Sequence, residues 1–205
     1  MANETKLVVI LDADVVGSTE LVQIDEKLAH DRIQDACSRF SQTISSVGGT
    51  AQEIRGDAIV AEFARASGAT SAALSFQAAN LAHNEELDGE IRPELRVGIA
   101  LGELVIADNT VTGAGVVLAQ RLEQLAQPGG VCISAAIHEA LPGRLSLDYK
   151  DLGEQPLKGF ERPQRAYLVS FVFESQHRAK HSTTGAYRAR SWASIHSGAP
   201  VRQSE

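Results

Sequence analysis

An unbroken apolar run near the N-terminus, followed by acidic residues and a turn, restricts the fold more than any other stretch. Residues 7–11 (LVVIL) are all apolar, which is the pattern of a strand buried on both faces. Asp12 and Asp14 come next, and residues 17–19 (GST) then offer a Ser or Thr to cap a following helix. Carboxylates at a strand end, beside free N–H groups at a helix start, suit a cation and a phosphate. At this point both aspartates are candidates, and a plain surface turn is the alternative.

Composition limits the class of protein. The chain has 205 residues, 43% of them hydrophobic, which is enough for one full domain with a sizeable core. Its formal net charge of −7 argues against non-specific binding to nucleic acid. No apolar run approaches the ~20 residues needed to cross a bilayer, and the N-terminus lacks a signal-peptide pattern. Cys37 and Cys132 are far apart in the sequence, one in a helical pattern and one in a strand pattern, so we expect buried free thiols, with a disulfide as the alternative. We therefore predict a cytoplasmic protein with no nucleic-acid and no membrane partner.

Helical and strand patterns alternate along the rest of the chain. Helices are predicted over residues 20–46, 67–87, 116–126 and 135–141. Strands are predicted over residues 50–55, 58–63, 95–101 with an extension to 107, 131–134, 145–152 and 165–172. The first two of these strands form a hairpin with a tight turn between them. This order predicts an α+β or α/β fold with helices over one sheet.

The last thirty or so residues have a different character. Residues 175–205 contain five Lys and Arg residues against a single acidic residue, and no apolar period is sustained in them. Such composition does not support a packed core. We predict a folded body over residues 1–174, followed by a basic and disordered tail over residues 175–205.

Asp57 supplies a second acidic position, at the tip of the predicted hairpin. A central strand and a neighbouring hairpin can bring Asp14 and Asp57 together, and two carboxylates at one point repel unless a cation lies between them. Mg²⁺ is the natural candidate, since it binds one or two carboxylates together with nucleotide phosphates. A simple turn at residues 55–57 is the alternative.

Five segments resemble, in order and at the same spacing, the motifs of class III nucleotidyl cyclase catalytic domains. They are residues 14–19 (DVVGST), 54–63 (IRGDAIVAEF), 96–103 (RVGIALGE), 110–122 (beginning TVTG and ending AQRL) and 157–160 (LKGF). One such motif would be weak, whereas five in register over about residues 5–172 are specific. Of the two early aspartates, only Asp14 is in register with the family's metal ligand.

The resemblance implies an α+β fold with a ferredoxin-like βαββαβ core, in which helices pack on a mainly antiparallel sheet. It implies a homodimer whose active sites lie at the interface. The implied reaction converts a nucleoside triphosphate to the 3′,5′-cyclic monophosphate and pyrophosphate, with two Mg²⁺ or Mn²⁺ ions per site. The implied ligands of the metal ions are Asp14 and Asp57, and Arg121 of the second subunit would stabilise the transition state. The implied phosphate contacts come from Lys158 and from the backbone N–H groups of Val15, Val16, Gly17, Ser18 and Thr19.

Three positions depart from the family pattern. Glu53 stands where the family has its base-selecting Lys, Thr110 stands at the second base-selecting position, and Val117 replaces the Asn that assists the transition state. An ionised Glu accepts hydrogen bonds and cannot donate them, so Glu53 suits the N1–H and N2–H of guanine. It can also accept from the N6 amine of adenine, and Thr110 can either donate or accept. Loss of a polar contact like that of the Asn can cost on the order of 10²–10³ in rate.

The sequence thus predicts a purine nucleotide cyclase. Adenylate cyclase is favoured because that activity is the commoner one in the family, and Glu53 favours guanylate cyclase as the alternative. Val117 favours a different class, a regulatory or dimerisation domain that binds nucleotide without turning it over. A pyrimidine nucleotide cyclase is a weaker third possibility.

Overall fold

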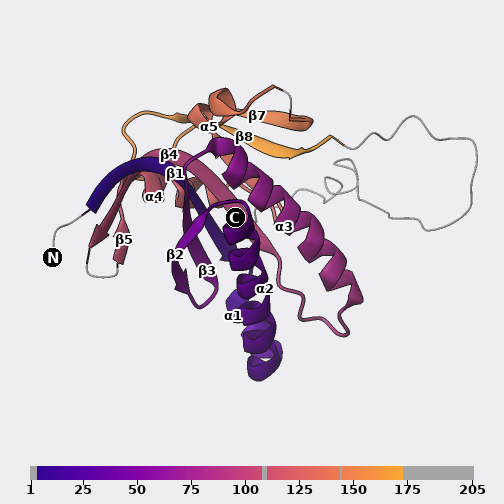
Figure 1. The fold of residues 1–205 in the computed structure, drawn as a ribbon. Coiled ribbons are helices and arrows are strands. Elements are labelled where there is room, and N and C mark those ends of the chain that lie inside the picture. The colour runs from indigo at the N-terminus through magenta and orange to yellow at the C-terminus, as the bar shows by residue number, and fades with distance from the viewer. Residues whose placement is uncertain (1–3, 108–109, 144, 173–205) are drawn as a thin grey trace, which may run out of the picture. The chain divides into compact units, whose positions relative to one another are not determined.

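The predicted first strand lies in the middle of the sheet. In the computed structural model, which describes residues 4–107, 110–143 and 145–172, β1 (Glu4–Val15) runs antiparallel to both of its neighbours, β3 (Ala58–Phe63) and β4 (Leu95–Ala107) (Figure 1). Side chains alternate between the two faces of a strand. Leu11 and the other odd-numbered residues from Val9 to Val15 enter the main hydrophobic core, whereas Ile10 and Asp12 face the opposite side and are also buried. Burial on both faces explains the apolar residues from Val9 to Leu11, whereas Leu7, at the start of the run, is 69% exposed.

The strand order confirms the expected fold class. The sheet runs β2-β3-β1-β4-β6-β8-β7, with β5 paired to β4. The remaining strands are β2 (Thr50–Arg55), β5 (Thr110–Thr112), β6 (Val131–Ser134), β7 (Leu147–Gln155) and β8 (Gln164–Phe171). Of the strand pairings among the described residues, only β4 with β6 is parallel. The chain order of β1, a helical segment, β2, β3, a helix and β4, together with the spatial order β2-β3-β1-β4, is the ferredoxin-like βαββαβ arrangement.

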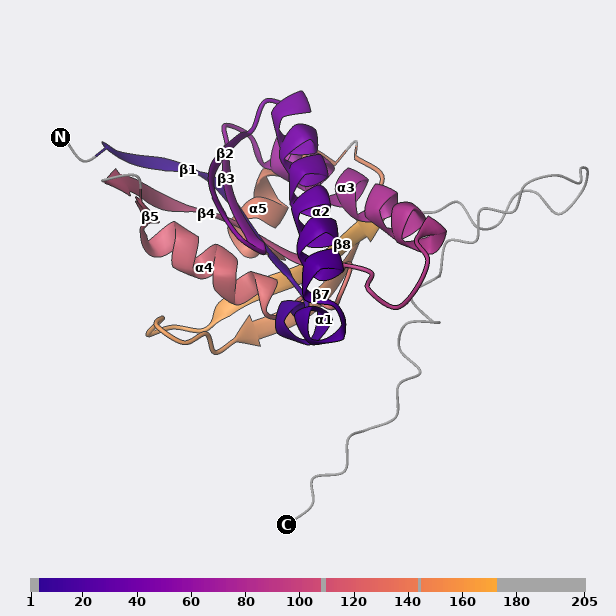
Figure 2. The ribbon, with the colours of Figure 1, turned by 90° about the horizontal axis from the view of Figure 1, so that it is seen from below.

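Helices cover both faces of the sheet (Figures 1 and 2). The helices α2 (Glu26–Ser46) and α3 (Ala66–Glu86) pack on the face that carries the main core, where the rings of Phe40 and Phe76 stack with centroids 4.1 Å apart. The short helix α5 (Ala135–Ala140) adds Ile137 to the same core. On the other face lies α4 (Ala114–Glu123), beside the even-numbered side chains of β1.

The region predicted as one helix over residues 20–46 is divided in two. A short helix, α1 (Ser18–Ile24), is separated from α2 by Asp25, whose backbone is extended and whose carboxylate accepts a 2.9 Å hydrogen bond from the N–H of Leu28. The prediction that Ser18 or Thr19 caps the first helix is wrong. Gly17 takes the N-cap position, with a φ of 63° that favours glycine, and the Ser18 hydroxyl binds another partner.

Two glycines of β4 allow α4 to lie directly on the sheet. A Cβ atom at Gly98 would lie 2.0 Å from the carbonyl oxygen of Ala119, and one at Gly102 would lie 2.4 Å from the Cα of Gly115. These are backbone atoms, which cannot swing aside as a side chain can. The close approach therefore depends on the missing side chains, and it places the last turn of α4 over the centre of the sheet.

Other expectations from the sequence have mixed outcomes. Cys37 and Cys132 are free and buried, as predicted. None of the helices in the described part of the chain is long and apolar enough to cross a membrane. The predicted tail over residues 175–205 lies outside the described residues.

Candidate functional site

The two predicted metal ligands lie together. Asp14 is the last but one residue of β1, and Asp57 occupies the tip of the β2–β3 hairpin. The β1–β3 register places Asp14 opposite Ala58, and the N–H of Val15 donates a 3.0 Å hydrogen bond to the Asp57 carbonyl. The Ser18 hydroxyl donates a 2.5 Å hydrogen bond to Oδ2 of Asp57. The strand end, the turn and the hairpin tip are thus joined at one point.

The electrostatics of this point suit a cation. Burial raises the pKa of Asp14, the charge of Asp57 raises it further, and Arg96 works in the opposite direction. No three His, Cys, Asp or Glu side chains of the described residues are placed to hold one ion. A cation here would therefore have two carboxylates and would need further oxygen atoms from water or from substrate. Mg²⁺ is commonly bound in this way, so the donor set fits it.

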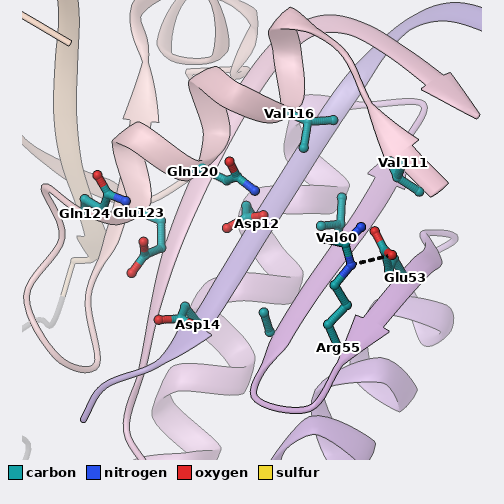
Figure 3. A pocket seen from close by; sticks show the side chains of 11 residues that line it. Asp12, Asp14, Glu53, Arg55, Val60, Val111, Val116, Gln120, Glu123 and Gln124 are labelled. Carbon is teal, nitrogen blue, oxygen red and sulfur yellow. Dashed lines mark hydrogen bonds and ion pairs between the residues drawn. The ribbon is translucent and has the colours of Figure 1, made fainter. Parts of the chain in front are cut away.

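A cavity of about 270 Å³ adjoins Asp14 on the α4 face of the sheet (Figure 3). Its polar lining comes from β1, β2 and α4, and consists of Asp12, Asp14, Glu53, Arg55, Gln120, Glu123 and Gln124. Val60, Val111 and Val116 are the larger apolar residues of its wall. An apolar wall with convergent polar groups is typical of a small-molecule site.

Glu53 does not lie alone in this cavity. Oε1 of its carboxylate is 2.5 Å from Nε of Arg55, two residues along the same strand (Figure 3). The Glu53 side chain is 16% exposed and that of Arg55 is 62% exposed. Glu53 and Arg55 therefore line the cavity as an ion pair.

The inner wall of the cavity carries buried acids. Asp12 is 5% exposed, and burial, followed by the charges of Glu123 and Asp14, raises its pKa to about 8. Burial likewise raises the pKa of Glu123 to about 7, although Arg96 opposes this. Oε1 of Glu123 lies 2.6 Å from Nε of Arg96, and Nη2 of Arg96 lies 3.7 Å from Oδ2 of Asp14. The Arg96 guanidinium thus forms ion pairs with a carboxylate of β1, Asp14, and with one of α4, Glu123.

Other predicted residues lie elsewhere. Nε of Arg121 donates a 3.2 Å hydrogen bond to the carbonyl of Lys158, so these two residues meet, but neither lines the cavity. Thr110 is exposed on β5, and its neighbour Val111 lines the cavity in its place. Val117 is 36% exposed on α4 and also does not line it.

Two backbone N–H groups of the predicted phosphate-binding turn already donate to other parts of the chain. The N–H of Val15 donates to Asp57, and the N–H of Val16 donates a 2.9 Å hydrogen bond to the carbonyl of Glu94. Within the described residues, the N–H groups of Gly17, Ser18 and Thr19 have no such partner. Of the five N–H groups predicted to contact phosphate, only those of Gly17, Ser18 and Thr19 therefore remain as candidates.

Comparison with known proteins identifies the family of this chain. The family model described as "Adenylate and Guanylate cyclase catalytic domain" matches residues 1–171. The chain belongs to this cyclase family. A protein named "Putative adenylate cyclase 3" from Rhizobium meliloti (strain 1021) is 37% identical over 177 residues, which cover 83% of this chain. An uncharacterized protein of Mycobacterium tuberculosis (strain ATCC 25618 / H37Rv) is 36% identical over 164 residues, which cover 78% of this chain.

The family relationship extends to solved structures. The crystal structure of an adenylate/guanylate cyclase/hydrolase from Silicibacter pomeroyi superposes with a TM-score of 0.74 at 32% identity, covering 82% of this chain and 99% of that one. This cyclase domain spans 30% of the length of the Rhizobium relative and 54% of the length of the mycobacterial one.

Several residues that line the cavity were not predicted from the sequence. Val116, Gln120 and Glu123 recur at helical spacing, so a helical wheel would have placed them on one face of α4. Arg55 lies two residues after Glu53 and so shares a face of β2 with it, which is also readable from spacing. The contacts of Arg96 had no such signal, because they depend on the β1–β4 register and on the packing of α4.

Proposed function

We propose that this cyclase domain converts a purine nucleoside triphosphate to its 3′,5′-cyclic monophosphate and pyrophosphate. The observation that carries the proposal is the meeting of Asp14 and Asp57 beside the polar cavity, on the cyclase fold. The names of the Rhizobium relative and of the Silicibacter structure belong to the same class of reaction. In this reaction the ribose 3′-oxygen bonds to the α-phosphorus, the bond from that phosphorus to the pyrophosphate oxygen breaks, and the hydroxyl proton is released.

Each group of residues has a proposed role. Asp14 and Asp57 would hold the divalent cations, Mg²⁺ or Mn²⁺ and two per site. Such ions, when bound, lower the pKa of the attacking hydroxyl and offset charge on the phosphates. Ser18 orients the Asp57 carboxylate through its hydrogen bond. The free N–H groups of residues 17–19, together with Lys158, are the proposed contacts of the triphosphate.

We further propose that two copies of the chain form the active sites. Arg121 and Lys158 meet each other but do not line the cavity that holds Asp14. This separation supports an active site that takes Arg121 from a second copy of the chain. A head-to-tail homodimer would supply Arg121 of one subunit to the carboxylates of the other.

The cavity supports guanine better than adenine as the base. The Glu53 carboxylate accepts from Arg55 through one oxygen and retains its other oxygen for a ligand. Guanine presents the N1–H and N2–H donors, whereas adenine presents the acceptor N1 beside its N6 amine. Adenine is supported instead by the family, in which adenylate cyclase is the commoner activity.

Val117 supports a second candidate function, a domain that binds nucleotide without turnover. An apolar side chain, 36% exposed on α4, stands where the family's Asn would contact the ribose. Loss of such a contact slows the reaction by about 10²–10³-fold, which is enough to leave a regulatory domain.

One assay separates the candidates. Purified protein is incubated with each of ATP, GTP, CTP and UTP in the presence of Mn²⁺, and cyclic products are quantified by chromatography. We expect a cyclic purine nucleotide, and no product from the Asp14→Asn variant. Absence of product from all four would refute the proposed reaction. Thermal stabilisation by a nucleotide without product would instead establish the second candidate.

A further inference from the structure

Arg96 lies between two carboxylates but is much closer to one of them. Its Nε is 2.6 Å from Oε1 of Glu123, whereas its Nη2 is 3.7 Å from Oδ2 of Asp14, too far for a hydrogen bond. The Arg96 and Asp14 residues are directly opposite each other in the β1–β4 register. Cross-strand partners are ordinarily close enough to pair, so the greater distance to Asp14 needs a cause.

Glu123 supplies that cause, and the backbone holds it in place. Its side chain is 5% exposed, and its backbone N would lie 2.4 Å from a Cβ at Gly98. The Gly98 and Arg96 residues are on the same face of β4, two positions apart. The contact of α4 with Gly98 therefore sets the Glu123 carboxylate beside the guanidinium.

We infer that Glu123 is a positioning residue for the cation site: by holding the Arg96 guanidinium, it prevents Arg96 from forming a direct hydrogen bond with Asp14 and leaves the Asp14 oxygens free to bind a metal ion. This inference rests on the proposed assignment of Asp14 and Asp57 as metal ligands. A guanidinium paired with Asp14 would occupy its oxygens and place a positive charge where the ion binds. Without Glu123, Arg96 would need to move only from its present 3.7 Å contact with Asp14 to hydrogen-bond distance.

The test measures binding of Mn²⁺ alone, by electron paramagnetic resonance in mildly alkaline buffer, with no nucleotide present. Glu123→Gln keeps the shape of the side chain and removes its charge. We expect its affinity for Mn²⁺ to fall about tenfold, as a partly screened charge contact would give. Glu123→Asp keeps the charge and should restore part of the lost affinity.

Loss of any nearby negative charge could also weaken cation binding, so two controls are needed. Glu53→Gln removes a carboxylate of the same cavity that pairs with Arg55 instead, and should change the affinity by no more than about twofold. The decisive comparison repeats Glu123→Gln in an Arg96→Met background, where no guanidinium remains to close on Asp14. There the substitution should have almost no effect on Mn²⁺ binding.

The outcomes are distinct. An equal loss of affinity with and without Arg96 would overturn the inference, because the effect of Glu123 would then not pass through Arg96. Failure of the native chain to bind Mn²⁺ would overturn it together with the metal assignment. A chain that binds Mn²⁺ as expected but forms no cyclic nucleotide would refute the proposed reaction and leave the inference intact. Thermal unfolding in EDTA confirms that each variant is folded before binding is measured.

Discussion

The hydroxyl of Ser18 donates a hydrogen bond of 2.5 Å to Oδ2 of Asp57, joining two segments that are 39 residues apart in sequence. It ties the turn after β1 to the tip of the β2–β3 hairpin. The bond fixes one oxygen of Asp57 and leaves the other available. Ser18 therefore contributes to the proposed cation site without being a ligand of it.

The first prediction concerns this hydrogen bond. Ser18→Ala should raise the concentration of Mn²⁺ needed for half-maximal turnover about tenfold, because the Asp57 carboxylate loses the donor that orients it. The rate at saturating metal should change less. Thr19→Ala is the matched control. Thr19 is exposed, and the hydroxyl that binds Asp57 belongs to Ser18 and not to Thr19. Equal metal dependence in both variants would show that Ser18 has no role at the site.

The second prediction concerns the proposed dimer. Asp57→Asn and Arg121→Ala should each be inactive alone, because each removes one essential group from both sites. Mixed in equal amounts and allowed to exchange subunits, they should recover about a quarter of native activity, since half of the dimers then contain one intact site of two. Activity that stays absent after exchange, with heterodimers present by native mass spectrometry, would place both residues in the same subunit's site.

The third prediction concerns base selection. Native protein should use GTP about tenfold better than ATP, as kcat/KM, because adenine sets an acceptor against the Glu53 carboxylate. Glu53→Lys combined with Arg55→Ser should reverse the preference. The second substitution is needed because Arg55 lies 2.5 Å from the Glu53 carboxylate and would otherwise face another cation. A ratio unchanged by the double substitution would remove Glu53 from the base site.

The fourth prediction concerns the contact between α4 and β4. Gly98→Ala should lower the free energy of unfolding by about 2–4 kcal/mol, because its Cβ would meet the backbone of Ala119 and Glu123. Gly143→Ala is the control, as nothing lies within 4 Å of a Cβ there, and it should change stability by no more than about 0.5 kcal/mol. Urea unfolding measures both. Equal stabilities would mean that α4 can move away from the sheet at no cost.

The fifth prediction concerns pH. Burial raises the pKa of Asp12 from 3.8 to about 8, so the folded chain keeps this proton to higher pH than the unfolded chain does. The contribution of Asp12 to the free energy of unfolding is fully present below about pH 4. It is lost as the pH rises to about 8, by up to about 1.4 kcal/mol per pH unit. Asp12→Asn should therefore flatten the fall in stability over this range. Urea unfolding in EDTA at several pH values checks it, and parallel curves for the two proteins would contradict it.

Local sequence was sufficient for the main elements and for the expectation that Asp14 and Asp57, the proposed metal ligands, lie close together. The apolar run at residues 7–11 predicted a strand that is buried on both faces from Val9 onward, and two short strand patterns at 50–55 and 58–63 around a tight turn predicted the hairpin that carries Asp57. These features depend on side-chain periodicity and on turn chemistry, which adjacent residues specify by themselves. The break at Asp25 was missed, although its capping carboxylate is also a local signal.

Tertiary structure alone decided the electrostatics of the cavity. Arg96 pairs closely with Glu123 and lies 3.7 Å from Asp14. This arrangement depends on the β1–β4 register and on a backbone contact at Gly98. That Ser18 serves Asp57 and not its own helix depends on where the hairpin tip lies. Charges and hydrogen bonds act through space, over residues far apart in the chain. The sequence by itself therefore determined which groups are present, and only the packing of the elements decided which of them are partners.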